Sequence, residues 1–125
     1  MSVMEPGQKM VAMVRQGRES EAAVVNECYA DDVVTIEGQG TEEMPAVIEG
    51  IDRLRGKHEW WYSNHDVNSV ELEGPFVGHR EDQFGIRFTI DVTPHGGARM
   101  QITEVGLFTV RDGKVFQEEY PYLMG

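Results

Sequence analysis

The sequence predicts a single α+β domain in which helices from the first half of the chain cover a strongly bent antiparallel sheet. Apolar residues recur every three or four positions before Asn64, as on one face of an α-helix, and every second position after it, as in strands. A chain of 125 residues with 40% apolar content can bury one hydrophobic core. No linker rich in Pro, Gly or Ser divides it, so we expect residues 1–125 to form one domain.

Two helices are expected first. Apolar residues at 10, 11, 13 and 14 share one side of a short helix that ends at Gly17. We expect Ser20 to cap the second helix, whose apolar stripe extends to Ala30. The β-branched run at residues 33–36 then favours a strand that stops at the turn of residues 38–40.

A third helix is expected from Gly50, after a segment whose structure the pattern does not define. Its inner face carries apolar residues and two imidazoles, at the positions Ile51, Leu54, His58, Trp61 and His65.

Four strands follow. Residues 70–73 alternate before Gly74 and Pro75, which break or bend the strand. Clean alternation marks residues 84–90, and turn residues at 93–97 lead into a strand over 100–110. A turn at 111–114 precedes the last strand, 115–122. Helices on one face of such a sheet predict a cone with one open end, a shape that suits a small-molecule pocket.

Alternation also predicts which polar side chains enter that pocket. Glu104 shares its strand face with Met100, Ile102, Phe108 and Val110. On the last strand we take the aromatic face as inward, with Phe116, Glu118, Tyr120 and Tyr122. Burial raises the pKa of a carboxyl group, and an imidazole exchanges protons near neutral pH, so His58, Glu104 and Glu118 are the predicted catalytic residues. The predicted ligand-binding residues are Trp61, Tyr62, Phe84, Phe88, Phe108, Tyr120 and Tyr122.

Structural alternatives to these roles remain open. A buried hydrogen bond would neutralise Glu104, and a strand register shifted by one residue would turn it to solvent. His58 alone would more often be a packed, hydrogen-bonded core residue than a catalyst.

Composition and motifs exclude several other classes of site. Eleven Lys and Arg against 22 Asp and Glu give a net charge of −11, which disfavours nucleic acid and anionic membrane surfaces as partners. The chain has no His-x-x-x-His, paired Cys or calcium-binding loop, and no GxGxxG or GxSxG motif, so we expect neither metal nor cofactor. A lone Cys28 and a first segment without the apolar run of a signal peptide predict a cytoplasmic protein.

The chain resembles the nuclear transport factor 2-like superfamily, and within it the SnoaL-like proteins. The resemblance covers nearly the whole chain and is carried by residues 29–34 (YADDVV), by Gly50-Ile51 and by residues 108–115 (FTVRDGKV). It implies a cystatin-like α+β barrel, a hydrophobic pocket and a homodimer formed through the outer sheet face. The outer faces of the late strands offer a mixture suited to such a dimer, namely Arg87, Thr89, Gln101, Thr103, Val105 and Leu107.

The resemblance does not supply a known catalytic set. By eye, the tyrosine, base and aspartic acid positions of ketosteroid isomerases fall at Met10, Gly38 and Gly106, although a register shift would restore Glu37 or Glu104. Tyr122 stands where SnoaL-like cyclases commonly carry Asp, while a pocket tyrosine of the third helix falls at His58. The sequence therefore predicts a small-molecule pocket protein. Its function would be cofactor-free acid/base isomerase, cyclase or lyase chemistry on a hydrophobic carbonyl compound, or alternatively ligand binding without catalysis or a dimeric association module.

Overall fold

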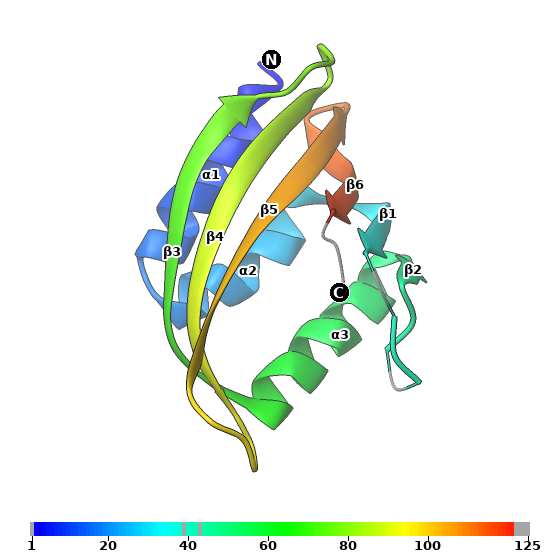
Figure 1. The fold of residues 1–125 in the computed structure, drawn as a ribbon. Coiled ribbons are helices and arrows are strands. Elements are labelled where there is room, and N and C mark those ends of the chain that lie inside the picture. Colours follow the sequence, from blue (N-terminus) through cyan, green and yellow to red (C-terminus); the bar gives the residue numbers. More distant parts are fainter. Residues whose placement is uncertain (1, 39, 43, 122–125) are drawn as a thin grey trace.

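Three helices pack against the concave side of a strongly bent, six-stranded mixed sheet (Figure 1). The computed structural model describes residues 2–38, 40–42 and 44–121. The helices are α1 (Met4–Arg15), α2 (Arg18–Cys28) and α3 (Ile51–Asn64). The strands are β1 (Tyr29–Glu37), β2 (Val47–Glu49), β3 (His65–Val77), β4 (Gln83–Pro94), β5 (Met100–Arg111) and β6 (Lys114–Tyr120), and they lie in the order β2-β1-β6-β5-β4-β3. The α+β prediction is confirmed.

The direction of one strand pair differs from the antiparallel sheet that the sequence predicts. Strand β6 returns beside β1 and runs parallel to it, with Thr35 opposite Glu118, whereas the other four strand pairs are antiparallel. Side-chain alternation reports which residues share a face, but it carries no information about the direction of a strand's neighbour.

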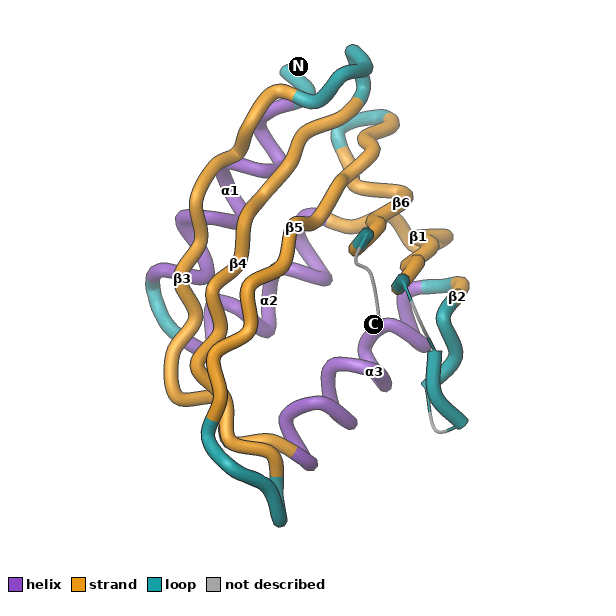
Figure 2. Tube along the Cα trace, viewed as in Figure 1, coloured by secondary structure: helices purple, strands orange, loops and turns teal. Residues whose placement is uncertain are grey.

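Helix α3 spans the space in front of the sheet. It runs from beside β1 and β2 to the start of β3 (Figure 2). Ile51 and Leu54 are buried, as the helical period predicts, and fix the first half of α3 against the core. Among the described residues, no helix is both long enough and apolar enough to cross a membrane.

Local backbone geometry shifts two boundaries from those that the sequence predicts. Helix α2 begins at Arg18, directly after Gly17, whose φ of 119° only glycine adopts readily. Ser20 is therefore inside the helix and not its cap, and its hydroxyl bonds to Gln16. The helix ends at Cys28, so that Tyr29 opens β1 instead of continuing the helix. The short strand β2 falls in the segment that the sequence left undefined.

Alternation is confirmed over residues 101–108 of β5, but Met100, expected on the inner face, is 46% exposed, and Gln83 and Thr109 of the opposite face are buried. Phe84, Ile86 and Phe108 are fully buried, and β3 bends at a register shift between Glu73 and Phe76 instead of breaking.

Alternation fails at the start of β6. Val110 pairs with Val115 and Thr109 with Gln117, so Phe116 is an extra residue, as in a β-bulge. Val115 is consequently in the core, while Phe116 is half-buried with the Arg111 guanidinium 4.6 Å from its ring centroid. The prediction that Phe116 faces the pocket is therefore wrong, although Glu118 and Tyr120, beyond the bulge, do face it.

Candidate functional site

A cavity of about 760 Å³ lies between the helices and the concave face of the sheet. This volume is within the range of small-molecule sites. Its apolar wall comes from α1, α2 and strands β3 to β5, including Met10, Val14, Val25, Leu72, Phe88, Ile90 and Ile102. Exposed residues of α3, such as Arg55 and Glu59, line it as well, so the cavity is reached from the solvent along this helix.

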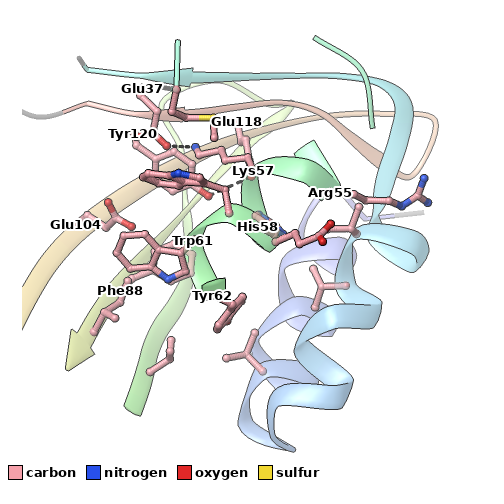
Figure 3. A pocket seen from close by; sticks show the side chains of 18 of the residues that line it. Glu37, Arg55, Lys57, His58, Trp61, Tyr62, Phe88, Glu104, Glu118 and Tyr120 are labelled. Atoms are coloured by element: carbon pink, nitrogen blue, oxygen red, sulfur yellow. Dashed lines mark hydrogen bonds and ion pairs between the residues drawn. The ribbon is translucent and has the colours of Figure 1, made fainter. Parts of the chain in front are cut away.

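A buried carboxylate, Glu118, forms the polar end of the cavity (Figure 3). Its side chain is 1% exposed and accepts hydrogen bonds from three hydroxyl groups. Thr35 donates at 2.9 Å, Tyr120 at 3.1 Å, and Tyr29 donates to the same oxygen as Tyr120. Burial raises the pKa of Glu118, and the hydrogen bond from Tyr29 opposes that rise.

The two phenols of this cluster stay neutral. Burial raises the pKa of Tyr29 and of Tyr120 well above the usual value, and the negative charge of Glu118 raises both further. Each phenol therefore remains a hydrogen-bond donor over the physiological pH range.

Glu104 enters the same cavity from β5, directly opposite Phe88 of β4. Burial raises its pKa to about 7; the charges of Glu37 and Glu118 act in the same direction, whereas Lys57 opposes them. Within the described ranges its carboxyl group has no hydrogen-bond partner. Both protonation states of Glu104 are therefore populated near neutral pH, and neither is held by a fixed contact.

An ion pair between Lys57 and Glu37 completes the polar end of the cavity. Their side chains are only 16% and 19% exposed. Glu37 ends β1 beside Tyr120 of β6, and the Lys57 ammonium lies 5.7 Å from the centroid of the Tyr120 ring. Figure 3 shows these three residues grouped with Glu118. Two acidic groups with raised pKa values, a cation and two phenols thus line one apolar cavity, an arrangement suited to moving a proton on a bound organic molecule.

Comparison with known families decides the assignment. The SnoaL-like domain family matches residues 1–122. This chain belongs to the SnoaL-like domain family. A crystal structure from Mesorhizobium loti, provisionally assigned as a SnoaL-like polyketide cyclase, is 36% identical, covering 98% of this chain and 100% of that one, with a TM-score of 0.84.

More distant structures share the fold of this SnoaL-like domain. A nuclear transport factor 2-like protein of unknown function from Burkholderia pseudomallei is 15% identical, with a TM-score of 0.75 and coverage of 98% of this chain and 92% of that one. A Mycobacterium tuberculosis protein in complex with estradiol-17β-hemisuccinate is 17% identical, with a TM-score of 0.71 and coverage of 99% and 96%. Curated proteins give no significant match.

The predicted site residues of the SnoaL-like domain divide into cavity-lining and core residues. His58, Trp61, Tyr62, Phe88, Glu104, Glu118 and Tyr120 line the cavity. Phe84 and Phe108 do not: both are fully buried in the core, stacked with ring centroids 5.1 Å apart. Phe108 contacts the rings of Phe88 and Tyr120 and so supports the cavity wall from behind. Tyr122 lies outside the described residues.

His58 lines the cavity, as the sequence predicts, but from an exposed position on α3. The preceding residue, Lys57, forms the contact with Glu37. Trp61 is half-buried and stacks on His65 at 3.9 Å between ring centroids.

Sequence reasoning missed Tyr29, Thr35 and Lys57, and it named Glu37 only as the base that a register shift would restore. Thr35 and Glu37 lie two and four positions after Val33, so they share its strand face and could have been assigned to the inner face. Lys57 follows Leu54 by three positions, which is the helical period, but a lysine is normally interpreted as solvated. Tyr29 gave no signal because the helical stripe continued through it.

A metal-binding role finds no support in the part of the chain that the structure describes. There, no three His, Cys, Asp or Glu side chains are grouped as metal ligands.

Proposed function

We propose that this SnoaL-like domain binds a small hydrophobic carbonyl compound and catalyses proton transfer on it without a cofactor, as an isomerase, cyclase or lyase. The observation that carries the proposal is Glu104, a carboxyl group with a pKa of about 7 in an otherwise largely apolar cavity. A general acid or base is most effective when its pKa lies near the working pH.

Glu104 acts as the proton-exchanging group in this scheme. Its ionised form removes a proton from a carbon next to the ligand carbonyl, and its protonated form returns a proton at another position. Because burial makes the free carboxylate costly, transfer of the proton to Glu104 is favoured more than it would be in water.

The negative charge that develops on the ligand oxygen needs a partner. The Lys57 ammonium has three N–H donors, so it can hold Glu37 and still face a ligand oxygen. Preorganised donors of this kind stabilise developing oxyanions. The hydrogen bonds to Glu118 hold Tyr29 and Tyr120 in place, and exposed His58 lies where a proton can pass to solvent.

Two relatives support the ligand class. The Mesorhizobium loti relative carries a provisional assignment as a polyketide cyclase, and the Mycobacterium tuberculosis structure holds a steroid derivative. The steroid ring system of the second ligand is apolar, which suits the apolar wall of this cavity.

Hydrogen–deuterium exchange into a model ketone tests the reaction. In D₂O, the protein is expected to accelerate exchange of the protons next to the carbonyl of α-tetralone, followed by NMR. Glu104→Gln keeps the shape of the side chain and removes its basicity, so exchange is expected to fall at least about tenfold. Glu71→Gln is the matched control because Glu71 is exposed on β3.

Either of two results would refute the catalytic proposal. One is exchange no faster than in buffer with a panel of bound cyclic ketones. The other is full activity of the folded Glu104→Gln variant.

Ligand binding without catalysis is the second candidate function. It is favoured by the saturated hydrogen bonding of Glu118, which resembles a fixed structural cluster more than a reactive group. Ketone binding without any exchange would support it.

A further inference from the structure

The cations that line the cavity are already bound to other groups. Lys57 is paired with Glu37, and Arg55 donates to Asp52 at 2.7 Å and to Asn26. Carboxylates, in contrast, are in excess, because Glu37, Glu59, Glu104 and Glu118 all line the same cavity. A ligand in this cavity therefore meets more negative than positive charge.

Hydrogen bonding separates Glu104 from the other buried carboxylates. Glu118 accepts three hydroxyl donors, and Glu37 is held by Lys57. Glu104 makes no hydrogen bond to another residue in the ranges that the structure describes. It is thus the acceptor that remains for a ligand group, and a charged donor makes the strongest hydrogen bond to it.

Aromatic rings border the same space. Trp61, Phe88 and Tyr120 line the cavity, and the centroids of the Phe88 and Tyr120 rings lie 6.2 Å apart. Figure 3 shows Trp61, Phe88 and Glu104 on one side of the cavity. The π-face of an aromatic ring attracts cations, as Lys57 already illustrates at Tyr120.

The electrostatic field of the whole protein also favours a positively charged ligand. A net charge of −11 attracts cations and repels anions before they reach the cavity.

We propose that the ligand carries a basic nitrogen, and that its ammonium group binds beside Glu104 among the rings of Trp61, Phe88 and Tyr120. The inference deepens the proposed function and rests on it for the cavity being the ligand site. A positive charge at this position lowers the pKa of Glu104, so the ionised form that accepts a proton is more populated near neutral pH but is a weaker base. The cavity therefore selects hydrophobic amines and discriminates against carboxylates of the same shape.

Three probes with one ring system test this selectivity by isothermal titration calorimetry: naphthylmethylamine, naphthylmethanol and naphthoic acid. At about pH 8 the amine is protonated and the acid is ionised. We expect the amine to bind roughly tenfold more tightly than the alcohol, and the carboxylate to bind most weakly.

Two variants, one that removes a negative charge from the cavity and one that removes a positive charge, make the test specific. Glu104→Gln is expected to abolish the preference for the amine while keeping alcohol binding. Lys57→Gln removes a competing positive charge and is expected to increase the preference. Glu71→Gln, on the exposed side of β3, is the control that leaves the order of the three probes unchanged.

The amine affinity is also expected to fall from about pH 8 to about pH 6 as Glu104 becomes protonated. The groups that face Glu104 are Glu37 from β1, Lys57 from α3, and Glu118 and Tyr120 from β6. His79→Gln, at an exposed position that does not line the cavity, is expected to keep this pH dependence, whereas Glu104→Gln loses it.

The binding test is independent of turnover. Equal affinities for amine and alcohol, tighter binding of the carboxylate, or no detectable binding of the amine would overturn the inference while leaving the ketone exchange assay to decide the proposed reaction. Amine selectivity without proton exchange would uphold the inference and contradict the catalytic proposal.

Discussion

The phenol of Tyr29, which opens β1, donates a hydrogen bond to the carboxylate of Glu118, which lies 89 residues later in β6. This contact joins the first strand to the last one at the polar end of the cavity, where β1 and β6 run parallel. Thr35 and Tyr120 donate to the same carboxylate, so one buried side chain connects the two strands that complete the sheet around the site.

Removal of Glu118 tests this connection. Glu118→Ala leaves three buried hydroxyl groups without their acceptor and opens a cavity, so the free energy of unfolding is expected to fall by about 3 kcal/mol. Glu118→Gln keeps an acceptor and is expected to cost less than Glu118→Ala. Urea denaturation measures both, and a Glu118→Ala variant as stable as the native protein would contradict the role of this cluster.

Glu104 makes the stability of the protein depend on pH in an unusual direction. Its pKa is about 7 in the folded protein against an ordinary value of 4.5, so the folded state binds more protons between these values. The contribution of Glu104 to the free energy of unfolding is therefore fully present below about pH 4.5 and is lost as the pH rises to about 7. The upper limit of this loss is about 3 kcal/mol.

The comparison with Glu104→Gln isolates this effect from other acids. Asp32 and Asp91 have pKa values lowered by hydrogen bonds from Arg111 and Arg99, and they act in the opposite direction. We expect the stability of Glu104→Gln relative to the native protein to rise between about pH 4.5 and pH 7, as measured by urea denaturation at each pH. A difference that does not change with pH would show that Glu104 titrates normally.

Gly106 controls the approach of β5 to the ring of Tyr120. A Cβ atom at this position would lie 2.6 Å from the Phe108 ring and 3.0 Å from the Tyr120 ring. Because Phe108 is fully buried and cannot move away, Gly106→Ala is expected to destabilise the fold by about 2 kcal/mol and to weaken probe binding. Gly56→Ala is the matched control, since Gly56 has open space in α3 and alanine there is expected to stabilise the helix by about 1 kcal/mol.

A homodimer through the outer face of the sheet remains a prediction. Val105 on β5 is 43% exposed, and it pairs across the strands with Arg87, which is also exposed. We expect sedimentation equilibrium to show a dimer and Val105→Glu to shift it toward monomer, because a charge buried between apolar and polar neighbours is costly. A monomeric native protein at all concentrations would contradict this prediction.

The sequence was sufficient to predict the helices, the late strands and the inward direction of Glu104. The spacing of apolar residues shows directly which face of a helix or strand is buried. The sequence was not sufficient where geometry depends on a neighbour that is distant in the chain. The parallel pairing of β1 with β6 and the bulge at Phe116 have no local signature, and the partner of Lys57 is Glu37, which lies 20 residues earlier in the chain. Phe84 and Phe108 were correctly assigned to the inner face, but depth within that face decides whether a ring lines a cavity or fills the core.

The most direct test of the account is the titration of Glu104 itself. Carbon-13 NMR of the glutamate side-chain carboxyl carbons, assigned with Glu104→Gln, follows its protonation as a function of pH in the ligand-free protein. The account predicts a midpoint at about 7 that moves down when naphthylmethylamine is bound. A midpoint near the ordinary glutamate value of about 4.3, unaffected by the amine, would contradict the central claim that Glu104 is the buried proton-exchanging group of this cavity.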